Sequence, residues 1–194
     1  MTPGQGMDAV GDAGPLVVIV TGLPCTGKTT IARQIAAAHG LPLATKDEYK
    51  ELLFDVLGWG DRAQSRCLGL AAVGVLDLFT QSHVRATQPC VVECNYKPEA
   101  AAGLIGLQQR HPFRPFQVVC RTDGSVLLER FAARTGTRHP GHGDEDLIDE
   151  SRPQLLAGEY APLDIGGTLW VVDTTEWGSV DLVPLLDAIG DALG

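Results

Sequence analysis

The sequence of 194 residues lacks the marks of several protein classes. No apolar run approaches the roughly 20 residues of a membrane-spanning helix, so we expect no membrane association. Residues 1–14 contain no Lys or Arg and no apolar segment, which predicts a disordered leader rather than a secretory signal. The five cysteines form no Cys-x-x-Cys pair and mostly lie in apolar runs. Together these absences predict a cytoplasmic protein.

Basic residues are also scarce. The chain has 15 Lys and Arg residues against 24 Asp and Glu, which gives a formal net charge of −9. An acidic domain repels the phosphate backbone that supplies most non-specific nucleic-acid affinity, so a nucleic-acid partner is not expected, although a local basic groove stays open. The length fits a single domain at residues 15–194, either as a monomer or as a homodimer.

Apolar runs that alternate with helical patterns predict an α/β fold. Residues 15–21 (PLVVIVT) form a β-branched run that is typical of a strand buried on both faces of a parallel sheet. Further strands are expected at 41–45, 90–94, 116–120 and 168–174, the last also buried, and helices at 28–39, 46–57, 61–86, 97–110, 123–134, 147–158 and 179–193. The broad apolar face of 61–86 indicates core packing. This alternation predicts layers around a mainly parallel sheet.

The most specific motif is GLPCTGKT, which matches G-x-x-x-x-G-K-[ST] and lies between the first predicted strand and the first predicted helix. Its glycines let backbone N–H groups close around phosphate oxygens, its lysine neutralises the β- and γ-phosphates, and its threonine hydroxyl coordinates Mg²⁺. We therefore predict binding of ATP, with GTP not excluded, and Mg²⁺. The predicted nucleotide-binding residues are Gly22, Leu23, Pro24, Cys25, Thr26, Gly27, Lys28, Thr29 and Thr30, with Thr29 as the metal ligand.

Polar residues that follow the predicted strands supply candidates for phosphoryl transfer. Asp47 comes just after the second short strand, at the sheet edge where ligands of such folds bind, and could orient or deprotonate an acceptor hydroxyl. A helix-capping carboxylate is the alternative. One turn later, Lys50 could hold Asp47 or an acceptor anion, or form a surface pair. Glu93 and Asn95 follow the third strand, with Glu93 a candidate on the magnesium side or a loop carboxylate.

Three arginines recur every four residues where a predicted helix runs into a polar loop at 135–146. Arg130, Arg134 and Arg138 could contact phosphates from a lid that closes over ATP and excludes water. A solvated basic stripe is the alternative. His139 and His142 lie in the same loop, but two histidines without a third ligand do not make a metal site.

Four segments of the chain resemble a known family. GLPCTGKTT, TKDEYKELLFDVLG, VVECN and LLERFAARTGTRHPGH are similar to small P-loop kinases of the AAA_33 or zeta-toxin-like group, which includes polynucleotide 5′-hydroxyl kinase domains and chloramphenicol phosphotransferase. The resemblance covers residues 15–175. It implies a three-layer P-loop fold with a five-stranded parallel sheet in order 2-3-1-4-5, helices on both faces and a lid.

The resemblance also implies roles for particular residues. Asp47 matches the general base and Lys50 the basic residue that contacts the acceptor, while Arg134 is favoured over Arg130 as the phosphate contact. Two positions depart from the pattern. Cys25 replaces a common glycine, and Lys50 stands where polynucleotide kinases use arginine, which weakens bidentate phosphate recognition.

These observations predict a kinase that transfers the γ-phosphoryl group of ATP to a hydroxyl of a small molecule. The predicted catalytic residues are Asp47, Lys28 and Arg134, and the predicted acceptor site contains Asp47, Lys50, Glu93 and Asn95. Three alternatives remain at this stage: a polynucleotide 5′-hydroxyl kinase, a nucleotide-dependent regulatory ATPase and a toxin-like kinase. Side-chain types alone do not identify the acceptor.

Overall fold

A computed structural model describes residues 14–97, 100–134 and 136–194, with only the backbone at 144–147. The expected leader therefore lies almost wholly outside the described residues. The strands are β1 (Leu16–Gly22), β2 (Leu43–Thr45), β3 (Cys90–Glu93), β4 (Arg114–Arg121) and β5 (Thr168–Asp173). The helices are α1 (Lys28–His39), α2 (Lys46–Leu57), α3 (Arg62–Arg85), α4 (Ala101–Arg110), α5 (Gly124–Arg134), α6 (Asp144–Ala157) and α7 (Val183–Leu193).

All five strands pair in parallel, in the order β2-β3-β1-β4-β5. This confirms the sheet implied by the sequence. Strand β1 is central and every one of its residues is buried, with Val18 in register with Val91 of β3 and Phe116 of β4. A β-branched run without polar interruption suits this position, because both faces of a central parallel strand are covered.

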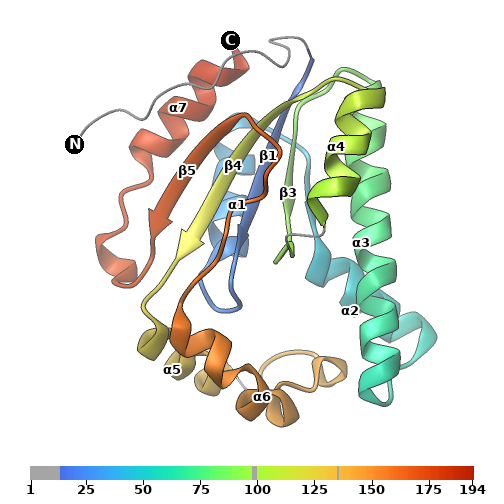
Figure 1. Cartoon of the computed structure of the whole chain (residues 1–194), viewed down its shortest axis with the longest axis vertical. Coiled ribbons are helices and arrows are strands. Elements are labelled where there is room, and N and C mark those ends of the chain that lie inside the picture. Colours follow the sequence, from blue (N-terminus) through green and yellow to red (C-terminus); the bar gives the residue numbers. More distant parts are fainter. Residues whose placement is uncertain (1–13, 98–99, 135) are drawn as a thin grey trace.

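Helices cover both faces of the sheet, which gives three layers (Figure 1). On one face, Val18 and Val20 belong to a core that includes Ile31 of α1 and Leu185 of α7. On the other face, the odd-numbered residues of β1 pack in a core with α3 and α4. Helices α5 and α6 lie apart from these layers, below the carboxyl ends of the strands in the view. The strands therefore point toward the α5–α6 unit.

Helix α3 has apolar residues on both its buried and its exposed sides. Leu68 and Leu76 are buried, while Leu70 and Leu78 are 75% and 63% exposed. By length and composition alone α3 could cross a membrane, which was not expected because no apolar run in the sequence approaches roughly 20 residues. This is weak evidence, since core helices of soluble proteins meet the same criterion.

Three sequence expectations need correction. Strand β5 is mostly exposed rather than buried, with Leu169 49% and Val171 46% exposed, because it lies at the edge of the sheet and only its other face contributes to the core shared with α7. Helix α6 begins at Asp144, so the expected loop at 135–146 ends earlier and includes a 3₁₀ turn at Pro140–His142. Helix α4 begins at Ala101 rather than at residue 97.

The close contact between α5 and α6 generates a stability prediction. A Cβ atom on Gly124 would lie 2.1 Å from the carbonyl oxygen of Leu156, whereas one on Gly74 in α3 would have no neighbour within 4 Å. We expect Gly124→Ala to lower the free energy of unfolding by about 1–3 kcal/mol through overpacking. Gly74→Ala should raise it by up to about 1 kcal/mol through helix propensity. Urea unfolding measures both, and equal effects would contradict the proposed packing.

Candidate active site

The loop between β1 and α1 wraps back on itself. Gly22 and Gly27 have φ angles of 144° and 80°, which residues with a side chain rarely adopt. Inside the loop, the carbonyl oxygen of Leu23 accepts hydrogen bonds from Thr26 Oγ1 at 2.9 Å and from Lys28 Nζ at 3.0 Å. A Cβ on Gly27 would also lie 2.5 Å from the ring of Trp177. Position 27 therefore requires glycine for two reasons: its positive φ angle, and the lack of space for a Cβ beside the ring of Trp177.

Cys25 occupies the left-handed region, with a φ angle of 68°. Such a conformation costs a non-glycine residue about 1–3 kcal/mol. A glycine at this position would adopt the same backbone angle without that strain. The cysteine side chain is half-buried against the cluster formed by Leu23, Leu127, Phe131 and Leu155. This contact joins the loop to helices α5 and α6.

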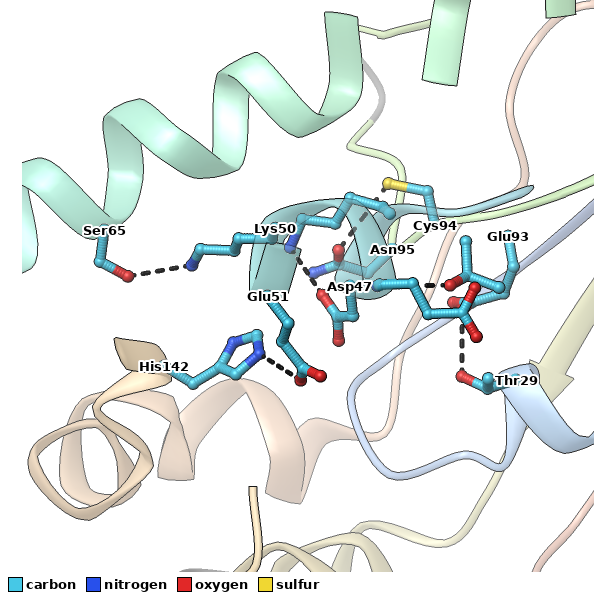
Figure 2. A network of polar contacts seen from close by, with 12 residues as sticks. Thr29, Asp47, Lys50, Glu51, Ser65, Glu93, Cys94, Asn95 and His142 are labelled. Atoms are coloured by element: carbon cyan, nitrogen blue, oxygen red, sulfur yellow. Dashed lines mark hydrogen bonds and ion pairs between the residues drawn. The ribbon is translucent and has the colours of Figure 1, made fainter. Parts of the chain in front are cut away.

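Glu93 ends β3 beside the start of α1. Its Oε2 accepts a hydrogen bond from Thr29 Oγ1 at 3.0 Å, and its Oε1 lies 3.9 Å from Lys28 Nζ (Figure 2). The carboxylate is buried, and burial raises its pKa even though Lys28 and the Thr29 hydroxyl favour the charged form. A buried acid, a hydroxyl and an ammonium thus converge at the mouth of the loop.

Asp47 lies in the first turn of α2. Thr45 caps this helix by accepting a hydrogen bond from the backbone N–H of Glu48. The two oxygens of Asp47 pair separately, Oδ1 with Lys46 Nζ at 3.1 Å and Oδ2 with an Arg138 nitrogen at 2.5 Å. Partial burial raises the pKa of Asp47, but these two cations outweigh it and bring the pKa well below its usual range. The carboxylate is therefore ionised at neutral pH.

The segment 136–143 between α5 and α6, called the lid below, contacts one stripe of α2. Arg138 pairs with Asp47, His142 Nε2 lies 2.9 Å from Glu51, and His139 Nε2 lies 3.2 Å from Asp55. The three carboxylates are spaced four residues apart and so share a helix face. Burial first, and then Arg138, lower the pKa of His142 to about 3, so its imidazole is neutral at physiological pH.

Eight of the predicted site residues line one cavity of about 180 Å³. Its lining residues come from the phosphate loop, α2, the end of β3, α5, the lid and α6: Pro24, Lys28, Lys46, Asp47, Lys50, Glu93, Asn95, Phe131, Arg134, Arg138, His142 and Ser151. The structure thus brings both predicted groups, nucleotide-side and acceptor-side, to the same space.

Three predicted residues lie differently from what their pattern suggests. Arg130 donates to the carbonyl oxygens of Thr174 and Thr175 at 2.8 and 3.0 Å, and does not line this cavity. Lys50 donates to Ser65 Oγ of α3 at 2.9 Å, so it reaches across to the next helix (Figure 2). Thr30 is exposed on α1. The four-residue spacing of the arginines therefore does not place all three side chains at the same site.

Sequence reasoning missed several residues of the cavity. Lys46 precedes Asp47 directly, and its charge beside an expected base was a usable signal. His142 was considered for the lid but not assigned to the site, because its burial depends on how the lid folds onto α2. Nothing in the sequence marks Phe131 or Ser151, because each reaches the cavity only through the packing of α5 and α6.

Comparisons with known proteins agree with this arrangement. The AAA_33 family model, described as an AAA domain, matches residues 17–155. A crystal structure from Chloroflexus aurantiacus, described as a "putative kinase", is 35% identical with a TM-score of 0.84, and the match covers 94% of this chain and 100% of that chain. None of the curated proteins matches the chain.

Two more distant structures share the fold alone. A sugar kinase from Janibacter sp. HTCC2649 is 20% identical with a TM-score of 0.52, covering 83% of this chain and 86% of that chain. A chain of the Pnkp1/Rnl/Hen1 RNA repair complex is 13% identical with a TM-score of 0.52, covering 80% of this chain and 50% of that chain. From its family match and its relatives, this chain belongs to the AAA_33 family and is a small P-loop kinase of that group.

Proposed function

We propose that the chain transfers the γ-phosphoryl group of ATP to a hydroxyl of a small-molecule acceptor, with Asp47 as the general base. The supporting observation is that Lys28 of the phosphate loop, Glu93 and Asp47 line one cavity. In-line transfer requires the triphosphate tail and the acceptor to meet in such a space, with cations close to the transferring group. Arg134 and Arg138 line the same cavity and supply further positive charge.

The residues beside the loop fit a magnesium ion. Mg²⁺ prefers oxygen ligands and usually keeps several waters, so one hydroxyl and one carboxylate from the protein are sufficient. Thr29 and Glu93 offer these oxygens 3.0 Å apart, next to the loop that would hold the phosphates. In the proposed complex, the Thr29 hydroxyl would hold the ion directly, and the Glu93 carboxylate would lie beside the ion. The ion would offset the negative charge of the triphosphate tail during transfer.

Asp47 would act mainly by orienting the acceptor. The acceptor oxygen forms a bond to the γ-phosphorus while the bond to the β-phosphate oxygen breaks, ADP leaves, and the hydroxyl proton passes to Asp47 and then to solvent. An aspartate with a lowered pKa is a weak base, but a loose transition state requires little proton transfer before the bond to phosphorus is largely formed. Orientation of the hydroxyl then contributes most.

Arg138 would couple the lid to this step. It now pairs with Asp47 Oδ2. In the proposed reaction, a carboxylate oxygen of Asp47 accepts the proton of the acceptor hydroxyl. When Arg138 moves to the γ-phosphoryl group, Asp47 loses a neighbouring cation and its pKa rises, which makes it a better base. Closure over the nucleotide would thus release and activate the base in one movement.

The size of the site favours a small acceptor over a polynucleotide. The cavity of about 180 Å³ is bounded on its acceptor side by the contacts between the lid and α2. Residues 15–194 would act as one kinase domain in the cytoplasm. A nucleic-acid acceptor would require an extended basic groove, which an acidic chain with a net charge of −9 does not favour.

Replacement of Lys28 tests nucleotide binding. We expect Lys28→Ala to abolish magnesium-dependent ATP uptake in calorimetry, because the ammonium group beside the β- and γ-phosphates is lost. Lys97→Ala is the matched control, since Lys97 is exposed and lies outside the cavity. Unchanged ATP affinity in Lys28→Ala would overturn the assignment of the loop.

Replacement of Asp47 separates binding from transfer. We expect Asp47→Asn to keep ATP affinity and to lower the rate of phosphoryl transfer by about 10²–10⁴-fold, the usual contribution of a general base. Glu48→Gln is the control, because the exposed Glu48 pairs with Arg33 outside the cavity. The assay incubates ATP, Mg²⁺ and pools of hydroxyl compounds, and detects new phosphate esters by phosphorus NMR. Wild-type turnover in Asp47→Asn would exclude this residue as the base.

Glu93 should stabilise the protein less when it is charged. Its pKa is raised in the folded state, so its contribution to stability is full below the unfolded pKa, near 4.3, and is lost as pH rises through the folded pKa. We expect Glu93→Gln to raise the melting temperature at pH 7, with the gain disappearing toward pH 4, and to weaken magnesium-dependent ATP binding. The exposed Glu129→Gln should show neither effect. A lower melting temperature for Glu93→Gln at pH 7 would contradict this.

A further inference from the structure

A second cavity of about 270 Å³ adjoins the first and shares Lys50 and His142 with it. It lies between the turn that joins α2 to α3, the first turns of α3 and the lid. Trp59 lines it on the turn, and Arg62 and Arg66 line it on α3. Because Lys50 and His142 line both spaces, the cavities lie side by side, and an acceptor that extends from Asp47 past Lys50 would reach the second space.

The walls of the second cavity are tied together. Lys50 donates to Ser65 Oγ at 2.9 Å, and Ser65 Oγ donates to the carbonyl oxygen of Gly141 in the lid at 2.9 Å. Arg62 also pairs with Glu150 of α6 at 2.5 Å. These contacts join α2, α3, the lid and α6 around the space. The lid therefore forms one wall of this cavity through its contacts with α3.

Positive charge is concentrated at these two cavities. Five Lys and Arg residues line the first and three line the second, with Lys50 common to both, so seven of the 15 in the chain are gathered here. Among the described side chains that line the second cavity, Asp61 is the one carboxylate, and it caps α3 by accepting a hydrogen bond from the backbone N–H of Gln64. In a chain with a net charge of −9, this is a local field for anions.

Arg66 is the exposed cation of this wall. Among the side chains that the structure describes, which exclude those of residues 144–147, no carboxylate forms an ion pair with Arg66, whereas Arg62 is paired with Glu150. Lys50 is 8% exposed, so its ammonium faces little solvent. A guanidinium on the wall of a partly enclosed space binds carboxylate or phosphate oxygens well, since it presents several N–H donors in one plane.

We propose that the acceptor carries an anionic group, a carboxylate or a phosphate, which the second cavity binds at Arg66 and Lys50 while the reacting hydroxyl lies at Asp47. This inference rests on the proposed function and specifies its substrate class. Lys50 follows Asp47 by three residues, a rise of about 4.5 Å along α2, so the residues that hold the two ends of the acceptor are slightly less than one helical turn apart. A neutral acceptor would offer Arg66 no counter-charge in this cavity.

Matched pairs of acceptors test the charge requirement. Aldonic acids are compared with the corresponding alditols, and monophosphorylated polyols with the free polyols, while ADP release is measured with ATP and Mg²⁺. We expect kcat/KM to be at least about tenfold higher for the anionic member of a productive pair, the usual effect of one charge-assisted hydrogen bond. Equal values, or higher values for the neutral members, would overturn the inference.

Variants of Arg66 locate the anionic group. With the anionic acceptor, Arg66→Ala should raise KM at least about tenfold with little change in kcat, and Arg66→Lys should recover part of the loss. The KM for the neutral member should not change. Arg85→Ala, an exposed arginine at the other end of α3, is the matched control. Wild-type KM for the anionic acceptor in Arg66→Ala would refute the assignment.

The same experiment separates this inference from the proposed function. Calorimetry with ATP and Mg²⁺ precedes the acceptor assays. Absence of nucleotide uptake would overturn the proposed function and the inference together. Nucleotide uptake with transfer only to neutral compounds, or to neither member of any pair, would overturn the inference and leave nucleotide binding intact.

Discussion

Strand β1 forms parallel hydrogen-bonded ladders with β3 on one side and β4 on the other. Because parallel strands end at the same edge of a sheet, this pairing places the loop after Gly22 next to Glu93. It also brings Cys120 of β4 into register with Gly22, just before the connection to α5. The phosphate loop, the magnesium-side carboxylate and the helix that leads into the lid therefore converge through main-chain pairing alone.

Much of the site could be predicted because its members are close to strand ends in the sequence. The boundaries of α1 and α2 agree with the sequence pattern, since Gly40 and Gly58 follow directly after the last turns. Asp47 lies just after one short apolar strand and Glu93 ends another, so their position at the sheet edge could be inferred from periodicity and topology. Their chemical roles still depend on neighbours that local patterns do not reveal.

The remaining features depend on long-range contacts. The pairing of Arg138 with Asp47 joins residues 91 positions apart and requires the lid to fold onto α2. Arg130 does not join Arg134 and Arg138 at the cavity, because it donates hydrogen bonds to the carbonyl oxygens of Thr174 and Thr175. The exposure of β5 follows from its place at the sheet edge, which its apolar composition does not indicate. In each case the partner is set by packing between elements, whose geometry a one-dimensional pattern does not contain.

The site also contains local features that oppose folding and that the core must offset. Cys25 holds a left-handed backbone, and burial opposes the charge of Glu93. Both lie beside β1, whose residues are all buried, so the best-packed part of the sheet supports the least favourable local geometry. A preorganised phosphate site requires backbone N–H groups and a carboxylate to be fixed before the nucleotide arrives, since reorganisation during the reaction would add to the barrier. The strain at Cys25 and the burial of Glu93 are therefore consistent with a rigid binding loop, while movement is left to the lid.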